Sequence, residues 1–245
     1  MMQIDILTLF PDMCNTVLNE SIIGRARRKG IVTVECHQIR DYTYDKHKRV
    51  DDTVYGPGMG MLMKAEPIAK CFETICEKRK KKPKFIYMSP QGKRLHQSKV
   101  KELAKEENIA ILCGHYEGVD ERLIEEFIDE QISIGDFIVT GGELPALILT
   151  DAIMRMIPGV LSSPECFEEE SYYNGLLEYP QYTKPAVWRN KAVPEILLSG
   201  HHKNIKKWRL EQSFLRTKKI RPDLLQSTIS LRNNKTFIIT LSRKL

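Results

Sequence analysis

Residues 109–127, with the sequence IAILCGHYEGVDERLIEEF, hold the pattern that decides the fold class. An uninterrupted apolar run, Ile109–Cys113, leads into a glycine-containing loop, and a helix-like stretch follows from Asp120 to Phe127. A short apolar run without polar interruptions is typical of a strand that is buried on both faces, as the strands of parallel sheets are. The stretch therefore predicts one strand–loop–helix unit of an α/β protein.

The same alternation continues on both sides of this unit. Further strand-like runs occupy Gln3–Phe10, Ile31–Ile39, Phe85–Met88, Ile132–Ile134 and Phe137–Val139. Helical patterns lie between or after them, at residues 12–29, Ala65–Arg79, Ser98–Glu107 and Glu143–Met156. This order predicts an α/β fold with a mostly parallel sheet and helices on both of its faces.

A change in composition after Gly159 predicts a domain boundary. Acidic and aromatic residues with weak periodicity fill Leu161–Tyr182, and a basic helical stretch follows around Asn204–Phe214. We therefore expect three parts. They are an α/β domain over residues 1–160, an interdomain linker over residues 161–175, and a small, mainly helical C-terminal domain over residues 176–245.

The net charge of +6 is concentrated in one segment. Between Lys184 and Arg221 the chain has eleven Lys or Arg residues and two acidic ones, with Trp188, Trp208 and Phe214 among them. A basic segment that contains aromatic residues is typical of a surface that binds nucleic acid, and a solvated helix face is the plainer alternative. We expect RNA contacts from Lys203, Lys206, Lys207, Arg209 and Arg216.

The sequence also indicates the cellular compartment. Six cysteines are scattered without a CxxC pair, which favours reduced thiols over a disulfide framework or a zinc cluster. No stretch approaches the roughly 20 apolar residues that cross a bilayer. The first residues form a strand-like pattern instead of a basic leader with a long apolar run. We therefore expect a cytoplasmic protein without a membrane segment.

Three strand ends are rich in glycine, proline and small polar residues. They are FIYMSPQG at residues 85–92, ILCGHYEGVD at 111–120 and ISIGDFIVTGGELP at 132–145. One such loop alone is more often a simple turn, but ligands of open α/β sheets bind beyond the carboxyl ends of the strands. The three loops together predict one pocket, with Gly141 and Gly142 lying against the ligand.

Common nucleotide and hydrolase motifs are absent from the sequence. GPGMG at residues 56–60 is not GxGxxG, and neither GxxxxGK[ST], GxSxG nor HExxH occurs. These absences argue against dinucleotide binding and against phosphoryl transfer by a P-loop. The histidines lack the spacing of metal ligands, so we predict no metal site.

Six motifs together resemble one known family. They are YMSPQG (87–92), CGHYEGVDER (113–122), SIGDFIVTGGELPA (133–146), RMIPGVL (155–161), GLLEYPQYTKP (175–185) and LLSGHH followed by IxxWR (197–209). In this order, from Met2 to about Leu225, the chain resembles the bacterial tRNA (guanine-N1)-methyltransferase family, TrmD. The resemblance implies the fold of the trefoil-knot (SPOUT) methyltransferases, with a deep knot at the cofactor site.

The resemblance implies that the three loops bind S-adenosylmethionine. The implied residues are Tyr87, Met88, Ser89, Pro90, Gly114, Tyr116, Glu117, Ser133, Ile134, Gly135, Asp136, Phe137, Ile138, Val139, Gly141, Gly142 and Pro145. The resemblance also implies tRNA as the partner and a homodimer, in which each active site lies between the knot of one subunit and the C-terminal domain of the other. A magnesium requirement is associated with the family as well.

The resemblance further implies the reaction and its catalytic residues. The substrate atom is N1 of the guanine immediately 3′ of the anticodon, preceded by another guanine. Counting back from Gly175, Glu170 stands where the family has its catalytic aspartate, which makes Glu170 the implied general base and Glu169 its rival. Arg155 occupies the position of an arginine that stabilises negative charge on guanine O6. The plainer interpretations are a solvated acidic run for Glu170 and a helix C-terminus for Arg155.

Three features depart from the family's pattern. Glu170 replaces the aspartate, Thr53 and Val54 replace an Arg-Pro pair, and residues 226–245 do not resemble the family's helical tail. Two other functions stay open: a ribosomal RNA methyltransferase of the same superfamily, and a non-catalytic RNA-binding protein. Methyl transfer to unmodified tRNA or to ribosomal RNA distinguishes these functions.

Overall fold

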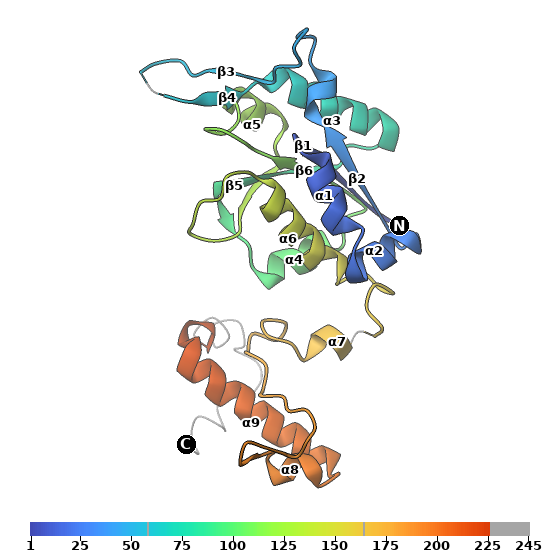
Figure 1. The fold of residues 1–245 in the computed structure, drawn as a ribbon, viewed down its shortest axis with the longest axis vertical. Helices are drawn as coiled ribbons and strands as arrows, with labels where there is room; N and C mark the ends of the chain where they lie inside the picture. Colours follow the sequence, from blue (N-terminus) through green and yellow to red (C-terminus); the bar gives the residue numbers. More distant parts are fainter. Residues whose placement is uncertain (58, 164, 226–245) are drawn as a thin grey trace, which may run out of the picture. The chain divides into compact units, whose positions relative to one another are not determined.

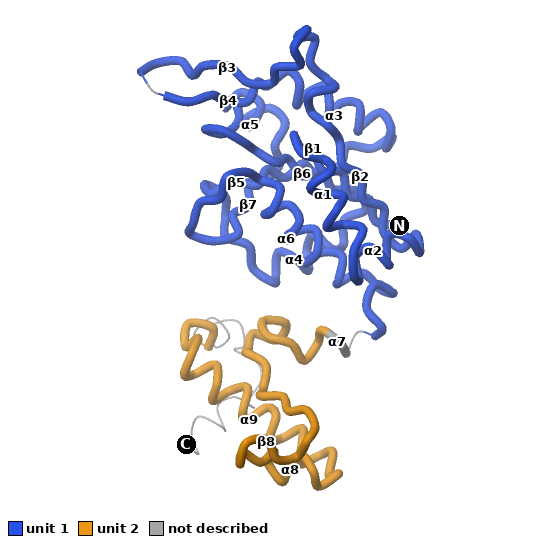
Figure 2. Tube along the Cα trace, in the orientation of Figure 1, with its two compact units in different colours: residues 1–163 blue, residues 164–245 orange. Residues whose placement is uncertain are grey.

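The computed structural model describes residues 1–57, 59–163 and 165–225. The contacts between residues divide the chain into two compact units, residues 1–163 and residues 164–245 (Figure 2). The domain boundaries and the linker expected from the sequence stay predictions. The atypical tail of residues 226–245 lies outside the described residues.

A five-stranded sheet forms the centre of the first unit (Figure 1). Its strand order is β2 (Val32–Gln38), β1 (Met2–Thr8), β6 (Asn108–Cys113), β5 (Lys84–Arg94) and β7 (Glu130–Ser133). Every neighbouring pair is parallel. This sheet confirms the predicted α/β class, and it makes β5, β6 and β7 neighbours. The trefoil knot stays a prediction.

Helices cover both faces of the sheet, as predicted. Four helices pack on one face: α1 (Pro11–Leu18), α2 (Ser21–Arg28), α4 (Gln97–Leu103) and α6 (Glu143–Met154). On the other face lie α3 (Ala65–Arg79), α5 (Glu121–Phe127) and the short 3-10 helix η1 (Ile39–Tyr42). The sheet is therefore the middle layer of three, with one hydrophobic core on each side.

Strand β6 shows why the apolar run in the sequence is uninterrupted. Ile109, Ile111 and Cys113 belong to the core under α6, and Ala110 and Leu112 belong to the core under α3. Because successive side chains of a strand point to opposite faces, a strand between two cores needs apolar residues at every position.

Two local predictions are wrong. Phe137–Val139, expected as a strand, is a loop between β7 and α6 whose side chains are exposed, so it has no sheet face to pack on. The single helix expected over residues 12–29 is two helices, α1 and α2, because Glu20 takes an extended conformation between them (φ −98°, ψ 163°).

A short antiparallel hairpin, β3 (Asp51–Thr53) and β4 (Met61–Met63), projects from the first unit. The GPGMG stretch lies between its two strands in the sequence. The base of the hairpin is attached to the body, because the Met63 amide donates to the Gly118 carbonyl (3.0 Å).

A buried ionic network ties the end of α3 to the sheet. Asp5 of β1 is completely buried. Its carboxylate accepts two hydrogen bonds from the Arg79 guanidinium (2.8 and 3.0 Å) and lies 2.7 Å from His37 Nε2. Burial by itself raises the pKa of Asp5, but the hydrogen bonds from His37 and Arg79 outweigh it and hold the pKa below its ordinary value.

The second unit consists of short elements and one long helix. In chain order these are α7 (Glu165–Glu168), β8 (Val187–Trp188), β9 (Lys191–Ala192), α8 (Glu195–Leu198) and α9 (His202–Ile220). β8 and β9 form an antiparallel hairpin. In the described ranges of both units, no helix is long and apolar enough to cross a membrane.

Candidate active site

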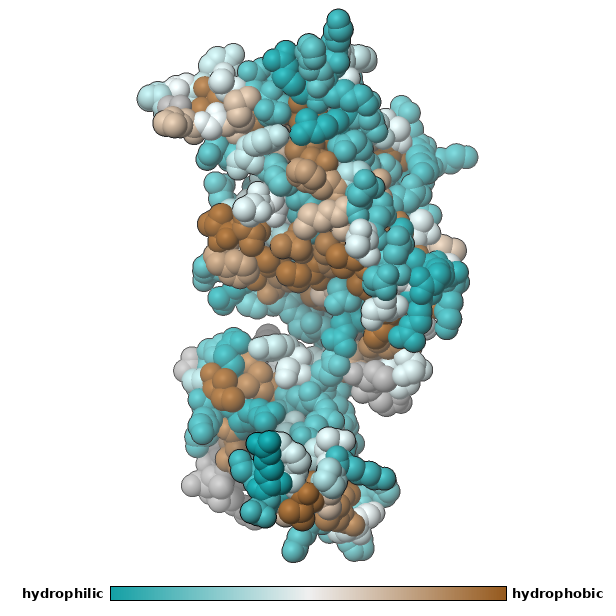
Figure 3. Space-filling view, in the orientation of Figure 1, coloured by the Kyte–Doolittle hydropathy of each residue, from teal (hydrophilic) through white to brown (hydrophobic). Residues whose placement is uncertain are grey.

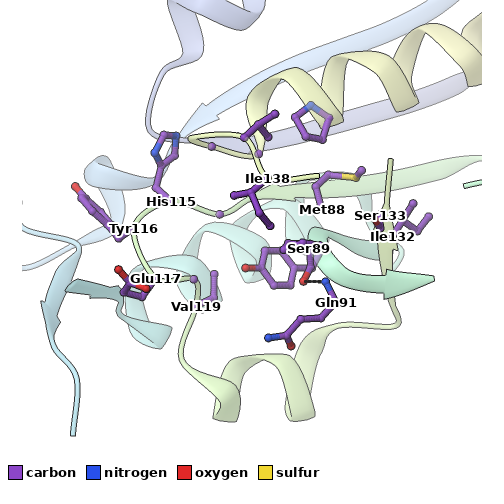
Figure 4. A pocket seen from close by; sticks show the side chains of 18 of the residues that line it. Met88, Ser89, Gln91, His115, Tyr116, Glu117, Val119, Ile132, Ser133 and Ile138 are labelled. Carbon is purple, nitrogen blue, oxygen red and sulfur yellow. Dashed lines mark hydrogen bonds between the residues drawn. The ribbon is translucent and has the colours of Figure 1, made fainter. Parts of the chain in front are cut away.

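A pocket of about 400 Å³ lies where β5, β6 and β7 present their following loops (Figure 4). Its walls come from residues 87–91, 114–119, 132–135 and 137–142, together with Leu62 of β4, Glu121 and Ile124 of α5, and Pro145 of α6. The three loops that the sequence predicted to form one pocket therefore do meet. This position agrees with the rule that open α/β sheets bind ligands beyond their strand ends.

The first of these walls is a bulge inside β5. The strand was expected to end at Met88, but it continues to Arg94. Its pairing with β7 shifts between Met88 and Lys93, so the intervening residues leave the ladder and line the pocket. A bulge re-aims side chains in this way without ending the strand.

All but one of the residues implied for the cofactor line this pocket. They are Tyr87, Met88, Ser89, Pro90, Gly114, Tyr116, Glu117, Ser133, Ile134, Gly135, Phe137, Ile138, Val139, Gly141, Gly142 and Pro145. Asp136 is the exception, because its side chain is exposed and lies 3.8 Å from the Arg94 guanidinium. That these residues share one cavity is an observation, and their binding of a cofactor stays a prediction.

Two glycines are required by the packing of the loops on one another. A Cβ atom on Gly142 would lie 2.6 Å from the Cα atom of Cys113. A Cβ atom on Gly141 would lie 2.3 Å from the ring of His115. These neighbours are protein atoms, so both glycines allow the loops to approach one another closely. Both also line the pocket, and the expectation that they lie against the ligand stays a prediction.

A hydrogen-bonded network that the sequence analysis missed fixes one side of the pocket. Glu143, in the first turn of α6, is only 3% exposed. One of its carboxylate oxygens accepts from the Thr8 hydroxyl (2.7 Å), and the other lies 2.7 Å from His115 Nε2. Thr8 and Glu143 are 135 residues apart, and only the sheet order brings them together. No local pattern in the sequence could have indicated this pair.

The pocket combines apolar and polar groups. The third loop contributes the apolar side chains of Ile134, Phe137, Ile138 and Val139. Glu117 and Glu121 contribute carboxylates, and Ser89 accepts a hydrogen bond from the backbone N–H of Gln91 (3.2 Å; Figure 4). Burial raises the pKa of the Tyr87 hydroxyl, so this residue lines the pocket as a neutral phenol.

In the second unit, the residues that follow α7 fold against α9. The Leu177 amide donates to the Thr217 hydroxyl (2.8 Å), and the Arg216 guanidinium donates to the Glu178 carbonyl (3.0 Å). The turn closes on itself, because the Glu178 amide donates to the Ser171 hydroxyl (3.0 Å). Residues 168–179, which we call the α9-docked loop, are therefore an ordered part of the second unit.

The five residues expected to contact RNA fall into two groups. Lys203, Lys206 and Lys207 are exposed on α9. Arg209 and Arg216 instead contact the α9-docked loop, Arg216 as described above and Arg209 with a guanidinium nitrogen 3.5 Å from Glu169. The RNA role of all five stays a prediction, and the internal contacts weaken it for the two arginines.

Comparison with known proteins identifies the family. A family model described as tRNA (Guanine-1)-methyltransferase TrmD matches residues 2–227. The chain is 58% identical over 223 residues to a protein of Ruminiclostridium cellulolyticum named tRNA (guanine-N(1)-)-methyltransferase, which covers 91% of this chain and 96% of that protein. A protein of the same name from Lachnospira eligens is 53% identical, over 93% of this chain and 97% of its own length. Another from Clostridium botulinum (strain 657) is 52% identical over the whole length of both chains. The chain belongs to the TrmD family.

The two residues implied as catalytic in this TrmD-family chain belong to different units. Arg155 is the C-cap of α6 in the first unit, at the opposite end of that helix from the pocket residue Pro145. Glu170 lies in the α9-docked loop, where its amide donates to the Phe167 carbonyl (3.3 Å). Arg155 does not line the pocket of its own unit.

In the described part of this TrmD-family chain, the pocket does not bring three metal-ligating side chains together. Among the described residues, Asp5, Glu35 and His37 have ligand atoms at metal spacing. They do not line the pocket, and the Arg79 guanidinium is hydrogen-bonded to Asp5 and lies 3.1 Å from Glu35. The positive charge in that cluster is already supplied by a side chain.

Proposed function

We propose that this protein is a tRNA (guanine-N1)-methyltransferase that transfers the methyl group of S-adenosylmethionine to N1 of the guanine immediately 3′ of the anticodon. The pocket carries the proposal, because in a chain of the TrmD family three separate loops line one cavity of about 400 Å³. The printed names of the relatives supply the reaction class. The choice of guanine rests on the resemblance of the motifs.

The residues of the pocket fit S-adenosylmethionine. Small-molecule sites span roughly 300–1,000 Å³ and combine apolar walls with a few polar groups. The apolar side chains of the third loop suit an adenine ring, Ser89 and the backbone groups of the loops offer hydrogen bonds, and Glu117 suits a cationic ligand. When bound, S-adenosylmethionine supplies a methyl group on a positively charged sulfur, which needs no further activation.

The work left to the protein is to align guanine N1 and to remove its proton. Glu170 is the proposed general base, and it must reach to about 2.6–3.2 Å from the donor atom in the bound complex. As the proton leaves, negative charge develops on guanine O6. The guanidinium of Arg155 is proposed to stabilise that charge.

We also propose a homodimer whose active sites are shared between subunits. At about 1.5 Å of rise per helical residue, Arg155 lies roughly 15 Å along α6 from Pro145. An arginine side chain does not span that distance to Pro145 of its own pocket. Arg155 is therefore proposed to serve the pocket of the partner. Glu170 is proposed to do so as well, because the resemblance implies a site between the knot of one subunit and the C-terminal domain of the other.

An exposed apolar face supports the proposed dimer. Met13 and Val17 of α1 and Leu144 and Ile148 of α6 are between 43% and 49% exposed, and apolar side chains gather over these helices in Figure 3. Because α1 and α6 pack against each other in one core, their exposed residues form one surface. Contiguous apolar surface of this kind marks an interface. A second copy of this chain is its proposed partner.

The exposed lysines of α9 and the β8–β9 hairpin are proposed to bind the tRNA. Trp188 in the hairpin is 58% exposed, and the Arg189 guanidinium lies 4.9 Å from the centre of its ring. The chain has no acidic residue between Glu178 and Glu195. Cations with an exposed aromatic ring suit phosphates and an unpaired base. A magnesium requirement and a cytoplasmic location complete the proposal, and no residue of the pocket is assigned to the ion.

Methyl transfer to defined RNAs tests the proposal. We expect label from S-adenosylmethionine on an unmodified tRNA transcript with guanine 3′ of the anticodon. A matched transcript with adenine at that position should stay unlabelled. Label on ribosomal RNA instead of tRNA would indicate the related rRNA methyltransferase, and binding of tRNA without any transfer would indicate a non-catalytic RNA-binding protein.

A further inference from the structure

The α9-docked loop contacts one face of α9 along several turns. The residues that contact it are Arg209, Arg216 and Thr217 of α9 and Arg221 at the helix C-cap, and Thr217 is buried. Residues spaced by three, four or seven positions lie on the same face of a helix. These side chains contact loop residues that precede Glu170 in the sequence and others that follow it, so the loop is held on both sides of Glu170.

Arg209 makes the contact closest in the chain to Glu170. Its guanidinium lies 4.6 Å from the centre of the Tyr179 ring and 3.5 Å from a carboxylate oxygen of Glu169. The Tyr179 hydroxyl donates to the same oxygen of Glu169 (2.8 Å). Burial and this hydrogen bond raise the pKa of Tyr179 to about 12, so its proton stays in place at neutral pH. Glu169 therefore accepts hydrogen bonds from the Tyr179 hydroxyl and the Arg209 guanidinium, and this guanidinium also lies over the Tyr179 ring.

The backbone at Glu170 is fixed by its neighbours. Its amide donates to the Phe167 carbonyl, and its carbonyl accepts from the Tyr173 amide (both 3.3 Å). The Asn174 side chain donates to the Glu168 carbonyl (2.7 Å) and closes the turn. Holding Glu169 from the α9 side therefore holds the peptide that leads directly into Glu170.

We propose that Arg209 is a positioning residue, which acts through Glu169 and Tyr179 to fix the loop that presents Glu170, and that it is not a phosphate contact. The inference rests on the proposed function, since it takes Glu170 as the general base. It also assigns Glu169, the rival base, to a structural contact. A displacement of about 1 Å can reduce a rate on the order of 100-fold, so a loose loop slows proton removal without weakening RNA binding.

Arginine and lysine variants distinguish positioning from a phosphate contact. Lysine keeps the positive charge but lacks the planar guanidinium that stacks on Tyr179 while reaching Glu169. In the full-length protein with saturating S-adenosylmethionine and tRNA, we expect Arg209→Lys to lower the single-turnover methylation rate by roughly 10- to 100-fold. The Kd for tRNA and its salt dependence should change by less than about twofold. The matched control is Arg25→Lys, an arginine exposed on α2 of the first unit, and it should leave the rate unchanged.

Glu169 variants test the same contact from the other side. Glutamine keeps an oxygen that accepts from Tyr179 and Arg209, whereas alanine removes it. We expect Glu169→Gln to stay within a few-fold of the normal rate and Glu169→Ala to resemble Arg209→Lys. The double variant Arg209→Lys with Glu169→Ala should be no slower than either single one, because both remove one contact. Faster amide hydrogen exchange in residues 168–179 of the free protein should accompany the slow variants.

Two results would overturn the inference. A normal rate for Arg209→Lys, with Arg209→Ala weakening tRNA binding and lowering its salt slope by about one, would make Arg209 a phosphate contact. A loss of activity in Glu169→Gln would make Glu169 the base. Glu170→Gln separates the inference from the function it rests on. If Glu170→Gln methylates at the normal rate, the proposed base is wrong, whereas an inactive Glu170→Gln beside a fully active Arg209→Lys refutes only the positioning role.

Discussion

At the scale of single residues, burial decides what a charged side chain can do. Asp5, Glu143 and Glu170 are all carboxylates, but their surroundings differ. Asp5 is completely buried between His37 and Arg79, and Glu143 is nearly buried between Thr8 and His115. Such groups hold the fold together because their partners are fixed. Glu170 is in a loop of the second unit, where its side chain is only partly buried.

Glu170→Gln should lower the methylation rate at least ~100-fold, since loss of a general base typically costs 10²–10⁴. The affinity for S-adenosylmethionine should stay nearly unchanged, because Glu170 does not line the pocket. Glu170→Asp should retain partial activity, as a carboxylate one methylene shorter. Single-turnover rates and calorimetry on the same preparations measure both effects. A parallel loss of cofactor affinity would point to a misfolded site instead of a missing base.

The Asp5 network predicts a dependence of stability on pH. The pKa of Asp5 is lowered in the folded state, so its contribution is complete above the unfolded value of about 3.9 and is lost as the pH falls through the lower folded value. Asp5→Asn should cost about 3–5 kcal/mol at neutral pH, because it leaves Arg79 buried without its charge partner. Denaturant unfolding should show this difference shrinking below about pH 4. A difference that stays constant down to pH 2 would contradict the assignment.

At the scale of elements, the side chains of α9 fall into two sets with different surroundings. Arg209, Arg216 and Thr217 contact the α9-docked loop, whereas Lys206 and Lys207 are exposed. The net charge of the segment does not distinguish the two sets, because an arginine adds the same charge whether it binds a backbone carbonyl or a phosphate. Their contacts distinguish them, because Arg209 and Arg216 are hydrogen-bonded to the α9-docked loop.

The exposed surface of α9 predicts a salt-dependent contact with tRNA. Replacing Lys206 and Lys207 with alanine should weaken tRNA binding, and the slope of log K against log salt should fall by roughly two at most. The affinity for S-adenosylmethionine should not change. Lys29→Ala with Lys105→Ala, two exposed lysines of the first unit, is the matched control. An unchanged slope in the α9 variant would identify that surface as merely solvated.

At the scale of the whole molecule, the position of Arg155 predicts how subunits complement each other. Arg155 and Glu170 of one chain are proposed to serve the partner's pocket, so a pocket variant and a Glu170 variant should rescue each other. Gly114→Val is a suitable pocket variant, because a Cβ atom there would meet the Tyr87 ring at 2.8 Å and push that ring within the pocket. Mixed with Glu170→Gln, it should restore up to one working site per heterodimer.

The matched mixture is Arg155→Ala with Glu170→Gln, and it should give no recovery. Each pocket receives both residues from its partner, so one pocket lacks the arginine and the other lacks the glutamate. Activity of the mixtures, with subunit exchange followed by mass, measures both outcomes. Recovery in the second mixture and none in the first would show that Arg155 and Glu170 act in different sites. No recovery in either mixture, with exchange verified, would argue against shared sites.

The sequence by itself determined the α/β class, the three pocket loops and the family. Those features are local in the sequence. An apolar run such as Ile109–Cys113 indicates a strand buried on both faces, and a motif such as residues 113–122 is recognised from consecutive residues. Only the tertiary structure decided which distant groups meet. Asp5 and Arg79 are 74 residues apart, and Thr8 and Glu143 are 135 apart. Periodicity carries no information on such pairs, because strand order, and not sequence distance, sets which side chains are neighbours. For the same reason the charge pattern places Arg209 among the expected RNA contacts, whereas its internal partners, Glu169 and Tyr179, are visible only in the structure.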